Sequence, residues 1–226
     1  LELVLLYSPL PATVCGEVCA HLCMDGCTRA KIDKPVNTEE FGKASLEIPS
    51  PSRARKTGRK VAVIGAGAGG LSTAWQLYLK GHDVDIYEAE EKIGGKLEYF
   101  IPKTRLPQRV LKGELKRFNV PGLMLRTGEP VDRDRFEAVC REYDAVVVAV
   151  GTHRPRGMSF EGSASSVTAY DFLKRANTGK ARSLRGKDVL ILGAGNVGMD
   201  VATEAYRLGA VQVTAVDIQK PAAFGK

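Results

Sequence analysis

The stretch KVAVIGAGAGG, residues 60–70, decides the fold of this chain. A short run of β-branched residues leads into the pattern GxGxxG, whose glycines are Gly65, Gly67 and Gly70. A helix-forming segment, Leu71–Lys80, follows the glycines. In such a unit the first glycine permits a tight turn, the second lets the backbone approach a pyrophosphate, and the third lets the helix pack closely on the strand. The stretch therefore predicts a dinucleotide site with the pyrophosphate at the helix N-terminus.

The residues after this helix favour FAD as the dinucleotide. The next expected strand, Asp83–Tyr87, ends at Glu88, whose carboxylate is placed to accept hydrogen bonds from ribose hydroxyls. A glycine pair in EKIGGKL, residues 91–97, brings Gly95 and Leu97 shortly after that carboxylate. Such a pair lets the backbone pass close to a bulky cofactor, and a simple turn is the alternative interpretation.

A second copy of the pattern begins at the strand expected over Asp188–Leu192. Its glycine loop supplies four candidate contacts for a nicotinamide nucleotide: Gly193, Gly195, Asn196 and Val197. The following strand, Val211–Val216, ends at Asp217, whose carboxylate can bind both ribose hydroxyls of NAD and would repel the 2′-phosphate of NADP. Lys220 would offset part of that repulsion. The sequence therefore predicts NAD(H), with NADP(H) as the alternative, and a purely structural role for this loop stays open.

Strand and helix signals alternate from Lys60 onward, which predicts an α/β fold of Rossmann-like units with parallel sheets. Besides the two glycine units, helices are expected at residues 107–118, 134–143 and 170–176. The continuous apolar run Ala145–Val150 predicts a strand that is buried on both faces. Gly151 stands at the end of this strand, where ligands approach such a sheet.

Composition divides the chain into four regions: residues 1–48, 49–60, 61–152 and 153–226. The first holds most cysteines, the second is rich in proline and basic residues, and each of the last two holds one glycine unit. The net charge is +7, but the basic second region has no interleaved aromatic residue, so we interpret it as a solvated linker and expect no nucleic-acid partner. No apolar run approaches the ~20 residues that span a bilayer. The short apolar start, Leu1–Tyr7, is interpreted as the end of a helix and not as a signal peptide.

Four of the five cysteines follow the spacing C-x3-C-x3-C-x3-C: Cys15, Cys19, Cys23 and Cys27. Their clustering favours a metal site in a cytoplasmic protein over a secreted disulfide framework. In one continuous helix the first and last would lie about 18 Å apart, too far for one zinc ion or one cubane. Either the segment folds back, helped by Gly16 and Gly26, or the cysteines serve two sites, and zinc stays an alternative metal. The fifth, Cys140, is interpreted as a buried structural thiol.

Several motifs resemble the glutamate synthase small subunit family, which includes NAD(P)H-dependent ferredoxin oxidoreductase subunits and a domain of dihydropyrimidine dehydrogenase. The matching stretches are PLPATVCGEVC at 9–19, DGCT at 25–28, KPVN at 34–37, IPKTRLP at 101–107, YDA at 143–145 with Gly151, and GNVGMD at 195–200. These flavoproteins are similar to the pyridine nucleotide-disulfide oxidoreductases. The stretches cover essentially the whole chain in the family's order.

The resemblance implies a two-dinucleotide-binding-domain flavoprotein, with FAD-binding residues 61–152 and NAD(P)H-binding residues 153–226. It implies that FAD contacts are made by Gly65, Gly67, Gly70, Glu88, Gly95 and Gly151, with Arg105 nearby. It also implies a mostly helical iron–sulfur segment at residues 1–48, where the four clustered cysteines bind [4Fe–4S] clusters. Such a subunit passes electrons between NAD(P)H and iron–sulfur clusters or ferredoxin within a larger complex, and no side chain is expected to act as acid, base or nucleophile.

The sequence departs from the family's pattern in three places. Family members carry an earlier cysteine motif that shares their clusters, so cluster binding by this chain alone is expected to be incomplete. Asp217 stands where the typical member has a basic residue that reads the 2′-phosphate. The nucleotide domain is expected to continue beyond Lys226. A non-catalytic electron conduit and a zinc-stabilised nucleotide-binding module are the alternative functions.

Overall fold

The computed structural model describes residues 2–155 and 157–218. The chain divides into two compact units. The first unit comprises Leu1–Glu98 and Thr104–Gly151, and the second unit comprises Tyr99–Lys103 and Thr152–Lys226.

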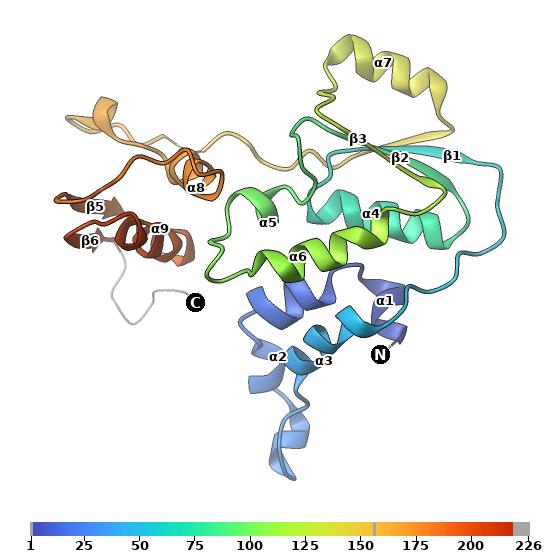
Figure 1. Cartoon of the computed structure of the whole chain (residues 1–226), viewed down its shortest axis with the longest axis horizontal. Helices are drawn as coiled ribbons and strands as arrows, with labels where there is room; N and C mark the ends of the chain where they lie inside the picture. The colour runs from blue at the N-terminus through green and yellow to red at the C-terminus, as the bar shows by residue number, and fades with distance from the viewer. Residues whose placement is uncertain (1, 156, 219–226) are drawn as a thin grey trace. The chain divides into compact units, whose positions relative to one another are not determined.

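The first unit is built on a four-stranded parallel sheet with the order β3-β2-β1-β4. Its strands are β1 (Lys60–Ile64), β2 (Asp83–Glu88), β3 (Leu123–Thr127) and β4 (Ala145–Val148). Helices α4 (Ala68–Leu79) and α7 (Arg133–Glu142) lie on opposite faces of this sheet (Figure 1). The expectation of an α/β fold with parallel sheets is confirmed, whereas strand β3 was not predicted.

Alternate residues of the central strands bury their side chains on opposite faces, as the pleat requires. On one face Val63 and Ile86 are fully buried, and α4, which contacts both central strands, buries Trp75 completely. On the other face Ala62 and Tyr87 form a core cluster with Val139, Tyr143 and half-buried neighbours. The two central strands are therefore covered on both faces.

The N-terminal segment is mostly helical, as expected, and it packs on the first unit. Its described elements are α1 (Glu2–Tyr7), a π-type turn η1 (Ala12–Val18), α2 (Leu22–Asp25), η2 (Thr28–Lys31), α3 (Thr38–Ala44) and η3 (Ser45–Glu47). The indole Nε1 of Trp75 donates a 2.7 Å hydrogen bond to the carbonyl oxygen of Leu5, and Gln76 Nε2 donates to that of Leu6 at 2.6 Å. These bonds satisfy carbonyls at the open end of α1.

The basic linker is not solvated throughout, which corrects the expectation from composition. The guanidinium of Arg53 donates to the carbonyl oxygen of Gly81 at 3.0 Å and to Oδ1 of Asp83 at 2.7 Å, and it lies over the ring of Tyr78. The amide of Ala54 also donates to the carbonyl oxygen of Leu79 at 2.9 Å. This part of the linker is held by the turn that ends α4.

Strand β4 and Cys140 also differ from the sequence-based expectations. Strand β4 lies at an edge of the sheet, so its apolar side chains are half-buried or exposed, and Val148 is 57% exposed. Cys140 is exposed because its neighbour Val139 occupies the buried face of α7. Adjacent residues of a helix point about 100° apart, so one buried position does not bury the next.

Between β2 and β3 the chain forms α5 (Lys96–Tyr99), α6 (Gln108–Leu115) and the short 3-10 helix η4 (Lys116–Phe118).

Within the described ranges, no helix combines the length and apolar character needed to cross a bilayer.

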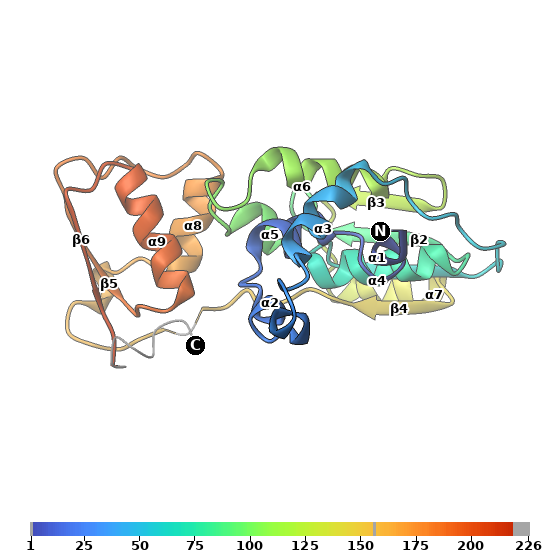
Figure 2. The same cartoon turned by 90° about the horizontal axis from the view of Figure 1, so that it is seen from below.

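The second unit repeats the strand–loop–helix–strand order on a smaller scale. It contains η5 (Ser163–Ser165), α8 (Ala169–Asn177), β5 (Asp188–Leu192), α9 (Asn196–Arg207) and β6 (Gln212–Val216). The two strands pair in parallel, and α8 and α9 lie side by side (Figure 2). Leu173, Ile191 and Val201 form its core cluster, with half-buried side chains such as Val213 packed around them.

Candidate functional site

The first glycine loop joins β1 to α4 in a geometry that only glycine allows. Gly65 has φ +103°, and a Cβ at this position would meet the carbonyl group of Ala149, the residue directly after the neighbouring strand β4. A Cβ on Gly70 would collide with the carbonyl oxygen of Gly65. The first and third glycines therefore serve the tight turn and the close approach of helix and strand that the motif predicts.

The N-terminus of α4 is open to an anion. Gly67 is the N-cap residue, it has extended backbone, and no side chain caps the helix. In the same unit α7 begins at Asp132, whose carboxylate accepts a hydrogen bond from the amide of Arg135. The first turn of α4 thus keeps the arrangement that binds a pyrophosphate through backbone N–H groups and the helix dipole.

Glu88 stabilises the first glycine loop by accepting hydrogen bonds from backbone amides. Its side chain is only 9% exposed, its Oε2 accepts a hydrogen bond from the amide of Ala66 at 2.8 Å, and its Oε1 accepts from the amide of Glu90 at 2.9 Å. An ionised carboxylate has about four acceptor positions, so these two bonds leave capacity for ribose hydroxyls. The predicted ribose ligand therefore lies in the right place and has a second task in shaping the loop.

A second glycine pair lies against the first loop. The amide of Gly94 donates to the carbonyl oxygen of Ala66 at 2.8 Å, and a Cβ on Gly95 would lie 2.8 Å from the Cα atom of Gly67. Leu97 is buried in α5, two residues after Gly95. The two loops thus form one backbone cradle, which a side chain at Gly95 would fill.

A groove of about 310 Å³ opens beside this cradle. Its lining residues come from the loop after β2, from β3 and from α6: Glu91, Lys92, Ile93, Glu98, Lys112, Leu115, Leu125 and Thr127. The contribution of β3 and α6 was not predicted, because the contact between these elements has no local pattern in the chain.

Gly151 and Arg105 are two further residues that are predicted to contact the flavin. Gly151 follows β4 with φ +72°, and a Cβ there would meet no atom within 4 Å. Arg105 is exposed in the loop before α6. A flavin contact of either residue stays a prediction.

The second unit repeats the loop geometry of the first. Gly193 has φ +107°, its amide donates to the carbonyl oxygen of Val216 at 2.8 Å, and a Cβ on Gly198 would collide with the carbonyl oxygen of Gly193. The amide of Ala194 donates to Oδ2 of Asp217 at 2.6 Å. In the first unit, the amide of Gly65 donates to the carbonyl oxygen of Tyr87 at 2.7 Å, as the amide of Gly193 does to that of Val216.

The first turn of α9 is also open. Gly195 is its N-cap residue and no side chain caps the helix, while Asn196 and Val197 are exposed in the first turn. The four predicted loop residues therefore lie together with Asp217 at one end of this small sheet. Lys220, which was predicted to offset part of the repulsion between Asp217 and a 2′-phosphate, lies outside the described residues.

The cysteine segment folds as a series of short turns and not as one striped helix. Cys15 lies in η1, Cys19 ends that turn, Cys23 lies in α2 and Cys27 precedes η2. His21 has a left-handed backbone conformation with φ 54°, and its Nε2 lies 2.7 Å from the carbonyl oxygen of Cys15. The chain direction changes at His21, whereas Gly16 serves a close contact with Gly42 and Lys43 of α3.

The thiols occupy different environments. Burial raises the pKa of Cys15, and the neighbouring Cys19 and Cys23 add to this effect. Hydrogen bonds from the backbone at Val36 and Arg29 lower the pKa of Cys27. Within residues 2–155 and 157–218, no three His, Cys, Asp or Glu side chains converge to hold a metal ion. The four cysteines by themselves do not form one closed metal site in this structure.

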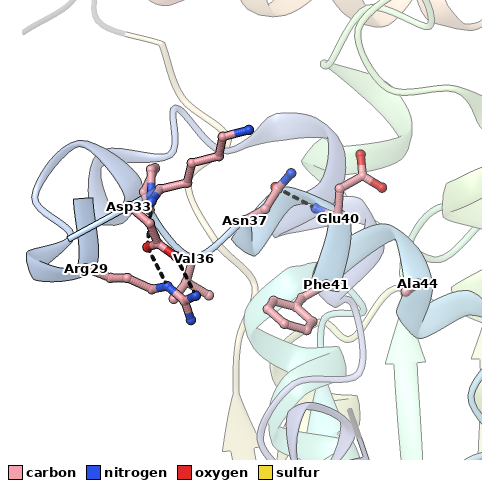
Figure 3. A pocket seen from close by; sticks show the side chains of 9 residues that line it. Arg29, Asp33, Val36, Asn37, Glu40, Phe41 and Ala44 are labelled. Atoms are coloured by element: carbon pink, nitrogen blue, oxygen red, sulfur yellow. Dashed lines mark hydrogen bonds and ion pairs between the residues drawn. The ribbon is translucent and has the colours of Figure 1, made fainter. Parts of the chain in front are cut away.

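A groove of about 710 Å³ lies next to the cysteine segment, between the loop after η2 and α3 (Figure 3). Phe41 and Val36 contribute its apolar surface, and the Arg29–Asp33 pair closes one side with Nη2 and Oδ2 2.8 Å apart. Asn37 caps α3 by accepting a hydrogen bond from the amide of Glu40 at 3.1 Å.

The sequence profile of the pyridine nucleotide-disulphide oxidoreductase family matches residues 59–223, which include both glycine loops. The chain belongs to this family. The family implies FAD and NAD(P)H as cofactors, and the two uncapped helix N-termini with their glycine loops fit two dinucleotides. The relationship expected from the motifs is thereby confirmed.

Curated relatives share much of the chain. It is 37% identical to the NAD-dependent dihydropyrimidine dehydrogenase subunit PreT of Escherichia coli (strain K12), over 90% of this chain and 52% of that protein. It is 34% identical to the NADP(+)-dependent formate dehydrogenase subunit beta of Moorella thermoacetica, over 89% and 33%. The NADPH-Fe(3+) oxidoreductase subunit beta of Geobacter sulfurreducens (strain DL-1 / KN400) is 32% identical, over 91% and 33%. The chain thus spans 33% to 52% of these relatives.

Among solved structures, a chain of the 2-naphthoyl-CoA reductase–2-naphthoyl-CoA complex has a similar fold. The TM-score is 0.54 at 22% identity, with 83% of this chain and 28% of that chain covered. This likeness supports the fold alone.

Proposed function

We propose that this chain is part of an FAD- and iron–sulfur-dependent oxidoreductase subunit of a larger complex. It passes electrons between NAD(P)H, with NADH preferred, and iron–sulfur clusters or ferredoxin. Residues 61–152 bind FAD and residues 153–226 bind the nicotinamide nucleotide. The observation that carries this proposal is the repeated loop geometry, in which Glu88 binds the amide of Ala66 and Asp217 binds the amide of Ala194.

When bound, the nicotinamide and the flavin supply hydride transfer and one-electron chemistry, and the protein places and tunes them. The first loop binds the FAD diphosphate at the open N-terminus of α4, and Glu88 holds that loop and accepts from the ribose. The paired loop at Gly95 leaves room for the cofactor. No side chain of this chain is assigned a proton-transfer role.

Asp217 gives the preference for NADH. One of its oxygens accepts from the amide of Ala194, so the carboxylate is fixed at the loop where a ribose would lie. A fixed negative charge at this place repels a 2′-phosphate. The relatives named above include both NAD- and NADP-dependent proteins, so the preference rests on this residue.

We further propose that Cys15, Cys19, Cys23 and Cys27 ligate more than one iron–sulfur cluster, together with ligands outside the described residues. The support is their cysteine spacing and their spread over separate turns, which suits shared clusters better than one four-thiolate site. The names of the relatives, which are subunits of dehydrogenases and an oxidoreductase, support a role inside a complex.

An anaerobic titration tests the proposal. The full-length protein or its complex is purified without oxygen, its visible spectrum is recorded, and NADH and NADPH are added separately. Bleaching of a flavin band by NADH at a much lower concentration than by NADPH is the expected result. A flavin that neither nucleotide reduces would favour the electron-conduit alternative, and a protein that binds no flavin would refute both functions.

A further inference from the structure

The proposed binding of FAD and nucleotide gives no role to Glu114, a fully buried carboxylate. Glu114, in α6, is 0% exposed, and its Oε1 and Oε2 accept hydrogen bonds from the amides of Ala12 and Thr13, each at 2.7 Å. These two amides open η1, the turn that carries Cys15. The N-terminus of this turn is therefore capped by a side chain 102 positions away in the sequence.

Arg117 completes the contact. Its Nη1 donates to Oε1 of Glu114 at 3.3 Å and to the carbonyl oxygen of Pro9 at 3.2 Å, and its Nη2 donates to the carbonyl oxygen of Ser45. The ion pair thus bonds to backbone on both sides of the cysteine segment. We call Glu114 and Arg117 the latch.

The other side of η1 is held by direct backbone contact. A Cβ on Gly42 would lie 2.6 Å from the amide nitrogen of Gly16 and 3.1 Å from the carbonyl carbon of Cys15. Helix α3, which contains Gly42, leads into η3, where the latch binds Ser45. The position of the Cys15 turn therefore depends on contacts with α3 and α6 and not on its own short helical turn.

Helix α6 also lies near the cradle formed by the two glycine loops. Leu115, the neighbour of Glu114, lines the 310 Å³ groove together with Ile93, and a Cβ on Gly94 would touch its side chain at 3.8 Å. The amide of Gly94 is bonded in turn to the carbonyl oxygen of Ala66 in the first glycine loop. All these residues belong to the first unit, so a series of neighbouring residues leads from the glycine loop to the Cys15 turn.

We propose that Glu114 is a positioning residue that couples filling of the flavin-binding loops to ordering of the Cys15 turn. This inference rests on the proposed function, because it takes FAD as the ligand of those loops. A ligand that orders the cradle restricts the adjacent end of α6, and the latch passes this restriction to the two amides that open η1. The cysteine segment then takes its fixed position only when the flavin is bound.

Hydrogen–deuterium exchange on the full-length protein tests the coupling, with the flavin first removed and then restored by added FAD. Three proteins are compared: the wild type, Glu114→Gln and the matched control Glu137→Gln, which makes the same chemical change at an exposed site on α7. In the wild type and the control, FAD is expected to slow exchange in peptides covering residues 65–70 and 12–18. In Glu114→Gln, residues 65–70 keep this protection, whereas residues 12–18 lose it and exchange about tenfold faster.

A purely structural role for Glu114 predicts a different result, because it would speed exchange at residues 12–18 equally with and without FAD. That outcome, or FAD protection of residues 12–18 that survives in Glu114→Gln, overturns the coupling. If Glu114→Gln does not fold, Glu114→Asp replaces it, since it keeps the charge opposite Arg117 but shortens the reach to the two amides. A wild type that binds no FAD refutes the proposed function itself, and this inference with it.

Discussion

Glu88 and Ala66 are joined by the hydrogen bond that shapes the first dinucleotide loop, with 2.8 Å between the carboxylate Oε2 and the backbone nitrogen. Asp217 and Ala194 repeat this relationship in the second unit at 2.6 Å. The carboxylate lies at the end of the second strand of each unit, as the last residue of β2 in the first unit and directly after β6 in the second. In both units the amide lies between the first two glycines of the loop. The carboxylate that would accept from a ribose thus also fixes the loop that would hold the diphosphate, so one substitution should affect both.

Replacing Glu88 with glutamine should weaken FAD binding. The amides of Ala66 and Glu90 bind different oxygens of Glu88, and a carboxamide replaces one of these oxygens with an NH₂ group, which cannot accept a hydrogen bond. Loss of a charge-assisted bond at a buried site should raise the dissociation constant for FAD by roughly 10- to 100-fold. Fluorescence titration of the flavin-free protein measures this, with the exposed Glu137→Gln as control. Equal affinities of E88Q and wild type would contradict the prediction.

Replacing Asp217 with asparagine should reduce the preference for NADH. The substitution removes the negative charge that opposes a 2′-phosphate, while the amide of Ala194 can still donate to the remaining carbonyl oxygen. We expect binding of NADH to weaken by about tenfold through the lost charge-assisted bonds to the ribose, with no loss for NADPH. Rapid-mixing measurement of flavin reduction with each nucleotide gives the ratio. An unchanged ratio would remove Asp217 as the residue that selects NADH.

The glycine loops could be predicted from the sequence because the steric contacts that require glycine lie within a single unit. A Cβ on Gly70 or Gly198 would collide with the first glycine of its own loop. The need for glycine therefore depends on residues that are close in sequence, and a short motif is enough to predict it. Strand β3 was missed because its sequence, LMLRT at 123–127, shows no regular alternation of buried and exposed residues. It joins the sheet by pairing with β2. Its place in the sheet is set by pairing and not by a local signal.

Long-range packing explains the other misses. Glu114 stands in an ordinary amphipathic helix, and its two amide partners lie about a hundred residues earlier, so no spacing reveals them. Composition predicted a solvated linker, but Arg53 donates hydrogen bonds to the carbonyl oxygen of Gly81, just after α4, and to Oδ1 of Asp83. Burial of β4 was overestimated because an apolar run does not show whether another strand lies beyond it.

The ion pair between Arg53 and Asp83 should make a small, pH-dependent contribution to stability. The hydrogen bond from Arg53 lowers the pKa of Asp83 below its ordinary value in the folded protein. The unfolded state then binds more protons at low pH, so the contribution is present above the unfolded pKa of about 3.9 and is lost as the pH falls through the lower folded pKa. Because the Asp83 side chain is 40% exposed, we expect about 0.5 kcal/mol.

Urea unfolding of the wild type and Asp83→Asn across pH measures this contribution. The difference in the free energy of unfolding should be constant above about pH 5 and should shrink below about pH 4. The exposed substitution Glu137→Gln serves as a control for the general effect of removing one surface carboxylate. A difference that grows as the pH falls would contradict the assigned ion pair.

Adjacent glycines at the start of α4 should respond to alanine in opposite ways. A methyl group at Gly70 would collide with the carbonyl oxygen of Gly65, so helix and strand must separate, whereas a methyl group at Gly69 would meet no atom within 4 Å. We expect Gly70→Ala to lower the free energy of unfolding by about 1–3 kcal/mol through overpacking. Gly69→Ala should raise it by up to about 1 kcal/mol, because alanine loses less backbone entropy in a helix. The single tryptophan, Trp75, is buried in the same helix, so its fluorescence during urea denaturation reports on this unit. Equal effects of the two substitutions would show that the close approach of α4 to β1 does not require the third glycine.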